Sequence, residues 1–186
     1  MYTYKFRLLF DEVEDFVRDY EILAGQTFQD FHNVIIKSIT GLNDKELASF
    51  YVCDRRWEKK TEITLIDMEI DKDDDDTGEN DMSKMIMSEC VLSEFIDDPH
   101  QRLIYEYDFF NLKTFYIELL KTYNVKTRKK YPQCVYAVGE MPLSMFNLSH
   151  EEIKISHLDN DISEDEETKD YYDEEDMRLL NDDIEI

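Results

Sequence analysis

Asp108 is the residue of this chain whose position best suits acid–base chemistry. It follows the run Tyr105-Glu106-Tyr107, so it would lie at the end of an aromatic strand, where the chain turns. If that end faces a pocket lined by Tyr105 and Tyr107, burial would favour the protonated carboxyl and let it act as an acid or base. Aspartate at a turn also accepts hydrogen bonds from backbone amides, and we favour this structural role. The sequence therefore gives one catalytic candidate, Asp108, with Tyr105 and Tyr107 as candidates for binding.

A basic cluster with an aromatic ring is the second group that could do chemistry. Arg55, Arg56 and Trp57 are followed closely by Lys59 and Lys60. An indole between basic side chains could stack on a nucleic-acid base while its neighbours contact phosphate. The alternative is that these bases neutralise acidic segments of the same chain. The formal charge of −24 favours neutralisation, so nucleic acid is not an expected partner unless a basic patch is masked.

Metal and cofactor sites are not expected. The acidic segment that begins at Asp73 partly resembles a calcium loop, with Gly78 at the turn. The twelfth position of such a loop requires a bidentate glutamate, but Lys84 stands there, so a solvated loop is favoured. No glycine-rich phosphate loop or G-x-S-x-G motif is present. The histidines have no metal-ligand spacing with one another or with cysteine; they are His32, His100, His150 and His157.

The negative charge is concentrated in two segments. The chain has 45 acidic and 21 basic residues, and Asp67–Asp81 and Glu151–Ile186 hold most of the excess. The rest of the chain is nearly neutral and rich in aromatic residues, which is typical of a folded body. Acid-dense segments repel themselves and stay solvated, and they oppose binding to anionic membranes. No secretory signal or membrane span is found, and three widely spaced cysteines suit a reducing compartment, so we expect a cytoplasmic protein.

Periodicity predicts an α+β fold with a mainly antiparallel sheet. Alternation over residues 2–8 predicts a first strand, and residues 16–23 a returning one. Thr27 and Asp30 form a capping-box-like start for a helix over about 27–39, which Gly41 would end. Strands are expected at 48–53 and 62–66, a second short helix at about 88–96, an antiparallel hairpin within 101–122 and a final strand at 131–138.

This order of elements resembles the plasmid pRiA4b ORF-3-like family, small α+β proteins carried on plasmids and as insertion-element passengers. The matching pieces are YKFRLLF, TFQDFHNVIIKSI, SFYVCD, CVLSEFI, LIYEYDF and YPQCVYAVGEMP, over about residues 1–143. The strongest match is the aromatic strand that enters a turn at Asp108. Members often continue past that turn with glycine, acidic residues and tryptophan, where this chain has Phe110–Lys113, so it resembles a divergent member. The resemblance implies a fold and no established enzymatic activity.

We therefore expect one domain over residues 1–145, with an acidic loop at 67–81 and an acidic tail at 146–186. The tail is either solvated or a segment whose apolar residues dock on this domain or on a protein partner. The leading hypothesis is a non-enzymatic cytoplasmic protein of mobile-element type that acts through macromolecular contacts. Two alternatives stay open: a small-molecule or enzymatic pocket near Asp108, and an acidic mimic of DNA.

Overall fold

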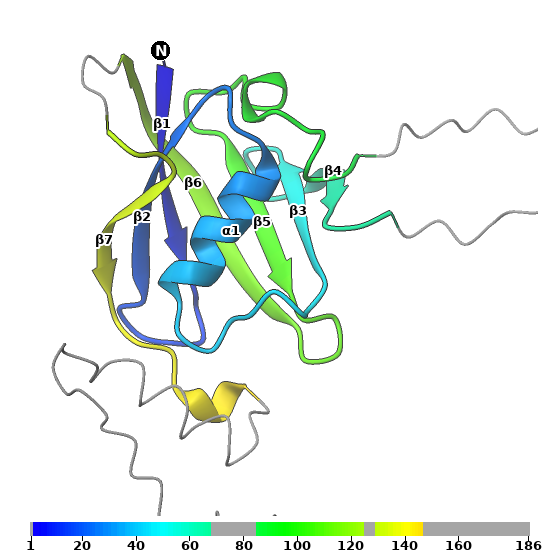
Figure 1. The fold of residues 1–186 in the computed structure, drawn as a ribbon, viewed down its shortest axis with the longest axis vertical. Coiled ribbons are helices and arrows are strands. Elements are labelled where there is room, and N and C mark those ends of the chain that lie inside the picture. Colours follow the sequence, from blue (N-terminus) through cyan, green and yellow to red (C-terminus); the bar gives the residue numbers. More distant parts are fainter. Residues whose placement is uncertain (1, 68–84, 125–128, 147–186) are drawn as a thin grey trace, which may run out of the picture. The chain divides into compact units, whose positions relative to one another are not determined.

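The computed structural model of the chain describes residues 2–67, 85–124 and 129–146. Its elements are β1 (Tyr2–Leu9), β2 (Val17–Leu23), α1 (Phe28–Ser38), β3 (Ala48–Cys53), β4 (Lys59–Thr64), β5 (Arg102–Tyr107), β6 (Lys113–Asn124) and β7 (Gln133–Val138). The seven strands form one sheet in the order β4-β3-β5-β6-β1-β2-β7, with antiparallel neighbours throughout. The helix α1 lies across one face of it (Figure 1). The expected α+β class is confirmed.

The helix α1 begins where its capping box predicts. The Thr27 hydroxyl accepts a hydrogen bond from the Asp30 amide, and the Asp30 carboxylate accepts one from the Thr27 amide, each at 3.2 Å. These bonds satisfy amides that the first turn leaves without an intrahelical partner, which is worth about 1 kcal/mol. The helix ends at Ser38 and Ile39 is already extended, so the left-handed Gly41 (φ 96°) shapes the following turn rather than the helix end.

Aromatic rings hold α1 on the sheet. Phe31 of the helix stacks on Phe6 of β1 with ring centroids 5.1 Å apart, and on Phe50 of β3 at 5.4 Å. Phe50 in turn contacts Tyr105 of β5 at 4.7 Å. These rings have essentially no exposed surface. Burying a large apolar side chain contributes about 2–3 kcal/mol, and favourable ring geometry adds about 1 kcal/mol per pair.

The second short helix, expected at about 88–96, is a 3-10 turn over Leu92–Glu94. Only its later amides bond within the segment, whereas the Leu92 amide donates to the carbonyl of Gln26 and the Ser93 amide to that of Ala24, both at 3.0 Å. Val91 is extended and bridges Thr27. Because these groups are used by tertiary contacts, a regular helix cannot form here.

The other expected strands are found, and β4 has the largest shift in its boundaries. Tyr105 pairs with Phe115 in the β5–β6 hairpin, and the final strand β7 pairs with β2. The strand expected at 62–66 is β4, which already begins at Lys59. The turn before β4 is short because the Asp54 carboxylate accepts hydrogen bonds from the Arg56 and Glu58 amides, at 2.8 and 3.0 Å.

Several expectations concern residues outside the described ranges. They include most of the acidic loop at 67–81, the calcium-like segment and nearly all of the acidic tail at 146–186. The chain divides into the units Met1–Leu148 and Ser149–Ile186, and every described residue belongs to the first.

Candidate functional site

Asp108 lies in the turn between β5 and β6, and its carboxylate accepts hydrogen bonds from backbone amides of that turn. Its backbone is left-handed, with φ 59°. The carboxylate oxygen Oδ1 accepts hydrogen bonds from the Phe110 and Asn111 amides, both at 3.1 Å. The other oxygen lies 3.7 Å from the ammonium of Lys113. Both oxygens thus have partners within the turn, which is the arrangement of a capping aspartate.

Tyr105 and Tyr107 point into the core beneath α1. The Tyr105 hydroxyl lies 2.8 Å from Nδ1 of His32, and the Tyr107 hydroxyl bonds both backbone groups of Asn43, at 2.8 and 3.1 Å. Burial raises the pKa of Tyr105 and raises that of Tyr107 to about 12. Both phenols are therefore neutral at physiological pH and serve as internal hydrogen-bonding groups.

The three residues of the hypothetical pocket thus have separate roles. Alternation along the strand predicts correctly that Tyr105 and Tyr107 share a face, but that face is covered by α1. Asp108 lies beyond the strand end, and it lines neither the cleft formed by residues 96–100 and 119–122 nor the small cavity beside Phe109. The next residue but one, Phe110, is 98% exposed at the tip of the turn.

Arg55, Arg56 and Trp57 lie in the β3–β4 turn. Arg55 forms an ion pair with Asp98 at 2.9 Å. The Trp57 ring contacts Tyr116 of β6 edge to face, with centroids 5.2 Å apart, and the guanidinium of Arg102 lies 4.9 Å from the indole centroid. The indole is thus packed on the sheet, with one cation beside it.

The nearby lysines also have acidic partners. Lys59 contacts Glu106 at 2.5 Å, and Lys60 contacts Glu58 at 2.6 Å and Asp54 at 3.5 Å. Much of this basic cluster is therefore neutralised by acids of the folded body itself. The sequence suggested that acidic residues of the loop and tail would neutralise the basic cluster. The acidic partners found here lie instead in turns and strands of the folded body.

The sheet face opposite α1, called the open face below, carries a row of apolar side chains across six strands. Each member of this row is the direct cross-strand partner of the next. Two of them, Leu9 and Val138, are 44% and 38% exposed. No described helix covers this face. Side chains that face each other across strands contact one another directly, so the row forms a continuous apolar stripe. From β3 to β7 its members are Tyr51, Ile104, Tyr116, Leu9, Val17 and Val138.

A charged group lies beside this apolar stripe. Asp19 of β2 is 2% exposed and accepts hydrogen bonds from Arg7 at 2.8 and 3.1 Å, while Lys5 lies 2.9 Å away. Burial alone would raise the pKa of Asp19, but the bonds from Arg7 and Lys5 outweigh it and hold the pKa below its usual value. The group is therefore a permanent ion cluster at neutral pH.

Comparison with known proteins decides the family. A sequence model of plasmid pRiA4b ORF-3-like proteins matches residues 3–178. This chain belongs to the plasmid pRiA4b ORF-3-like family. The match continues past residue 143, where the resemblance quoted from the sequence ends. No curated protein matches the chain significantly.

A solved structure shares the fold of this pRiA4b ORF-3-like protein. It is a crystal structure titled as a protein of unknown function, MM3350, from Methanosarcina mazei Go1. The TM-score is 0.56 at 18% sequence identity, and the match covers 94% of this chain and 96% of the other. A match at this level of identity supports a shared fold, and the roles of individual residues cannot be transferred from it.

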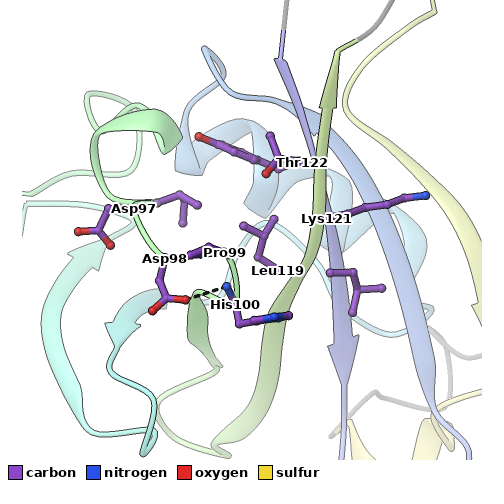
Figure 2. Close-up of a pocket in the computed structure, with 10 residues that line it drawn as sticks. Asp97, Asp98, Pro99, His100, Leu119, Lys121 and Thr122 are labelled. Carbon is purple, nitrogen blue, oxygen red and sulfur yellow. Dashed lines mark hydrogen bonds between the residues drawn. The ribbon is translucent and has the colours of Figure 1, made fainter.

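A cleft beside β6 was not foreseen from the sequence. It has a volume of about 580 Å³ and combines an apolar floor with polar groups from the turn that precedes β5 (Figure 2). It arises because β6 extends past the start of its neighbour β5. No local sequence pattern predicts this difference in strand length. Pro99, between Asp98 and His100, was the one signal of a fixed turn at this place.

The described part of the chain offers little for metal, thiol or membrane chemistry. No group of three or more His, Cys, Asp or Glu side chains there could hold a metal ion. Cys53, Cys90 and Cys134 are free, and burial raises the pKa of each thiol, which disfavours the nucleophilic thiolate. No described helix is long and apolar enough to cross a membrane.

Proposed function

We propose that this pRiA4b ORF-3-like protein acts in the cytoplasm by binding another protein, without catalysing a reaction. The observation that carries the proposal is the apolar stripe of the open face. Leu9, Val138 and the neighbouring Tyr136 (51% exposed) lie together where β1, β2 and β7 adjoin. Apolar side chains gathered on one face of a sheet are a frequent feature of protein-binding surfaces.

The state of the acid–base candidates supports a role without catalysis. Asp108 caps a turn, Tyr105 is bonded to His32 and Tyr107 is bonded to the backbone of Asn43. A catalytic group needs a free proton-transfer position within reach of a substrate. These four side chains instead use their polar atoms inside the fold, which favours binding over enzymatic activity.

The acidic tail is the second element of the proposal. Glu151–Ile186 combines many carboxylates with apolar residues such as Tyr171 and Leu179. Such a segment either screens basic side chains of its own domain or docks apolar anchors on a protein partner. Nucleic acid is a poorer partner, because most bases of the Arg55–Lys60 cluster already have acidic partners.

Quantitative affinity capture from the native host tests the proposal. Three tagged proteins are compared: the full chain, a deletion of residues 151–186, and a full chain with Leu9→Glu and Val138→Glu. The proposal expects the open-face substitutions to abolish capture of a specific protein, and the deletion to change it. DNA affinity of the same proteins is measured by anisotropy with a labelled duplex.

A matched variant controls for added charge. Gln29→Glu and Asn33→Glu place two new carboxylates on the outer side of α1, away from the open face, and should leave capture intact. Equal capture by the wild type and the Leu9/Val138 variant would overturn binding through the open face. Capture and DNA affinity that are both unchanged by the deletion would count against an active tail.

A further inference from the structure

The turn between β5 and β6 presents large apolar side chains to solvent at one end of the sheet (Figure 1). Phe110 is 98% exposed, and its neighbours Phe109 and Leu112 are 38% and 50% exposed. Ile66, shortly after the end of β4, is 49% exposed and lines a small cavity together with Phe109. These four residues are called the tip patch below. Single exposed apolar side chains are common on protein surfaces, whereas a group of them is typical of an interaction site.

Hydrogen bonds hold this turn in a fixed shape. The Asp108 carboxylate accepts hydrogen bonds from the Phe110 and Asn111 amides, and the Asp108 amide donates to the carbonyl of Leu47 at 2.9 Å. The side-chain amide of Asn111 donates to the carbonyl of Met145 at 3.2 Å. The turn is thus bonded to two other segments of the fold. Because Phe110 is held in place, binding through it loses less conformational entropy than binding through a flexible loop.

The charged residues around the tip patch are mainly acidic. The segment before β3, which accepts the bond from the Asp108 amide, contains Asp44, Lys45 and Glu46, and Asp67 directly follows Ile66. The carboxylate and the ammonium of the turn itself lie 3.7 Å apart and balance each other. An anionic membrane surface is repelled by such a rim, whereas a basic protein surface is attracted to it.

We propose that the tip patch binds a protein segment whose apolar face is flanked by lysine or arginine side chains. Phe110 makes the central contact, because it is the most exposed large apolar side chain of the residues that the structure describes. Aromatic side chains are enriched in the buried centre of protein interfaces. Asp44 and Glu46 lie at the rim, where complementary charge increases the association rate and the specificity.

The tip patch is a different surface from the apolar stripe of the open face. Its members lie in turns at one end of the sheet, whereas the stripe runs across the strands. Binding through the tip patch therefore does not depend on the proposed open-face partner. Phe110 also contributes almost nothing to the core, so its substitution should leave the stability of the fold unchanged.

The probe is a fluorescein-labelled peptide of leucine and lysine, titrated with the full chain and followed by anisotropy. Its leucines recur with the period of an α-helix, so that one apolar face is flanked by lysines. A peptide of the same composition in scrambled order keeps the charge but lacks the apolar face. The titration is done at about 0.15 M salt, where the Debye length is about 8 Å and long-range attraction to the acidic chain is screened. We expect the amphipathic peptide to bind about tenfold more tightly than the scrambled one.

Substitutions test whether the peptide occupies the tip patch. Phe110→Ser should weaken binding of the amphipathic peptide about tenfold, a loss typical of a central interface residue, and Phe110→Trp should retain binding. Tyr2→Ser is the matched control, because it removes a 61% exposed aromatic ring from the opposite end of the sheet. Leu9→Ser combined with Val138→Ser removes apolar surface from the open face. Neither control should change the affinity.

Three results of the titration would overturn the proposal. They are equal binding of the two peptides, equal affinity of the wild type and Phe110→Ser, and a loss of binding in the Leu9/Val138 variant instead of in Phe110→Ser. Phosphatidylcholine vesicles give a further test. Vesicle binding by the wild type that Phe110→Ser abolishes would assign the tip patch to a lipid surface and also overturn the proposal. Absence of vesicle binding would support a protein partner.

Discussion

The imidazole of His32 and the hydroxyl of Tyr105 share a 2.8 Å hydrogen bond between α1 and β5. Both side chains are buried, with 1% and 0% of their surface exposed. Burial lowers the pKa of His32 to about 4, although the negative charge of Asp44 acts in the opposite direction. The histidine is therefore a neutral core residue that ties the helix to the sheet.

The first prediction concerns the pH dependence of folding. An unfolded histidine titrates near pH 6.5 and the folded His32 near pH 4, so between these values the unfolded state binds more protons. The free energy of unfolding should then fall by about 3 kcal/mol as the pH is lowered from 7 to 4. His32→Gln should remove this part of the pH dependence in urea unfolding. The exposed His100→Gln should keep the wild-type slope, and a common slope for all three proteins would contradict the assignment.

Tyr105→Phe is the second prediction. It removes the hydroxyl and leaves the buried Nδ1 of His32 without a partner, at an expected cost of about 1–3 kcal/mol. Tyr51→Phe is the control, because its hydroxyl bonds Glu62 at a more exposed site and should cost less than about 1 kcal/mol. Chemical denaturation of the two variants checks the order. A smaller loss for Tyr105→Phe would show that the buried imidazole finds another partner.

Local patterns were sufficient where a structure depends on nearby residues. The capping box of Thr27 and Asp30 predicts the start of α1, and alternation predicts the faces of β5 and β6. Alternation cannot say what covers a face. The sequence could therefore place Tyr105 and Tyr107 on one face, but it could not distinguish a pocket from a face that a helix covers.

Elements that depend on distant backbone contacts could not be read from the sequence. The expected helix is reduced to the 3-10 turn at Leu92–Glu94 because the Leu92 and Ser93 amides bond Gln26 and Ala24. The cleft exists because β6 continues past the start of β5. Both require the register of strands that are far apart in the chain, and apolar periodicity does not specify that register.

Gly41→Ala is the third prediction. Gly41 has a φ of 96°, and an added Cβ would overlap the ring of Phe146. Backbone strain and overpacking together should lower the free energy of unfolding by about 2–4 kcal/mol. Gly25→Ala is the matched control, because nothing lies within 4 Å of its Cβ position, and it should be neutral or slightly stabilising. Combining Gly41→Ala with Phe146→Ala should relieve the overlap with the ring but not the backbone strain, so the double variant should lose less free energy of unfolding than the sum of the two single variants. A loss equal to that sum would contradict the overlap between the new Cβ and Phe146.

The Asp19 ion cluster gives the fourth prediction. The lowered pKa of Asp19 means that its contribution is present above the unfolded value near 3.9 and is lost as the pH falls through the folded value. Asp19→Asn leaves Arg7 and Lys5 without their carboxylate and should cost about 1–3 kcal/mol at pH 7. The difference from the wild type should shrink as the pH falls below about 4. Asp11→Asn, at an exposed turn, should show no such convergence.

Arg18 supports the last prediction, which concerns the edge strand β7. Its guanidinium is 2% exposed and forms no ion pair with another described residue. It donates hydrogen bonds to the carbonyls of Val17, Val138 and Gly139 at 3.0, 2.6 and 2.8 Å, and lies 4.3 Å from the ring centroid of Phe16. The planar fork thus holds the end of β7 against β2 through several carbonyls at once.

A lysine cannot reproduce this arrangement, because a single ammonium does not span several carbonyls and stacks poorly on a ring. Arg18→Lys should therefore lower the free energy of unfolding by about 2 kcal/mol. Hydrogen exchange should accelerate first in Gln133–Val138 and leave the central strand β5 protected, because the lost bonds lie at one edge of the sheet. Arg56→Lys, in an exposed turn, should change neither quantity. Uniform acceleration across β5 and β7 would show that Arg18 supports the whole fold rather than this edge.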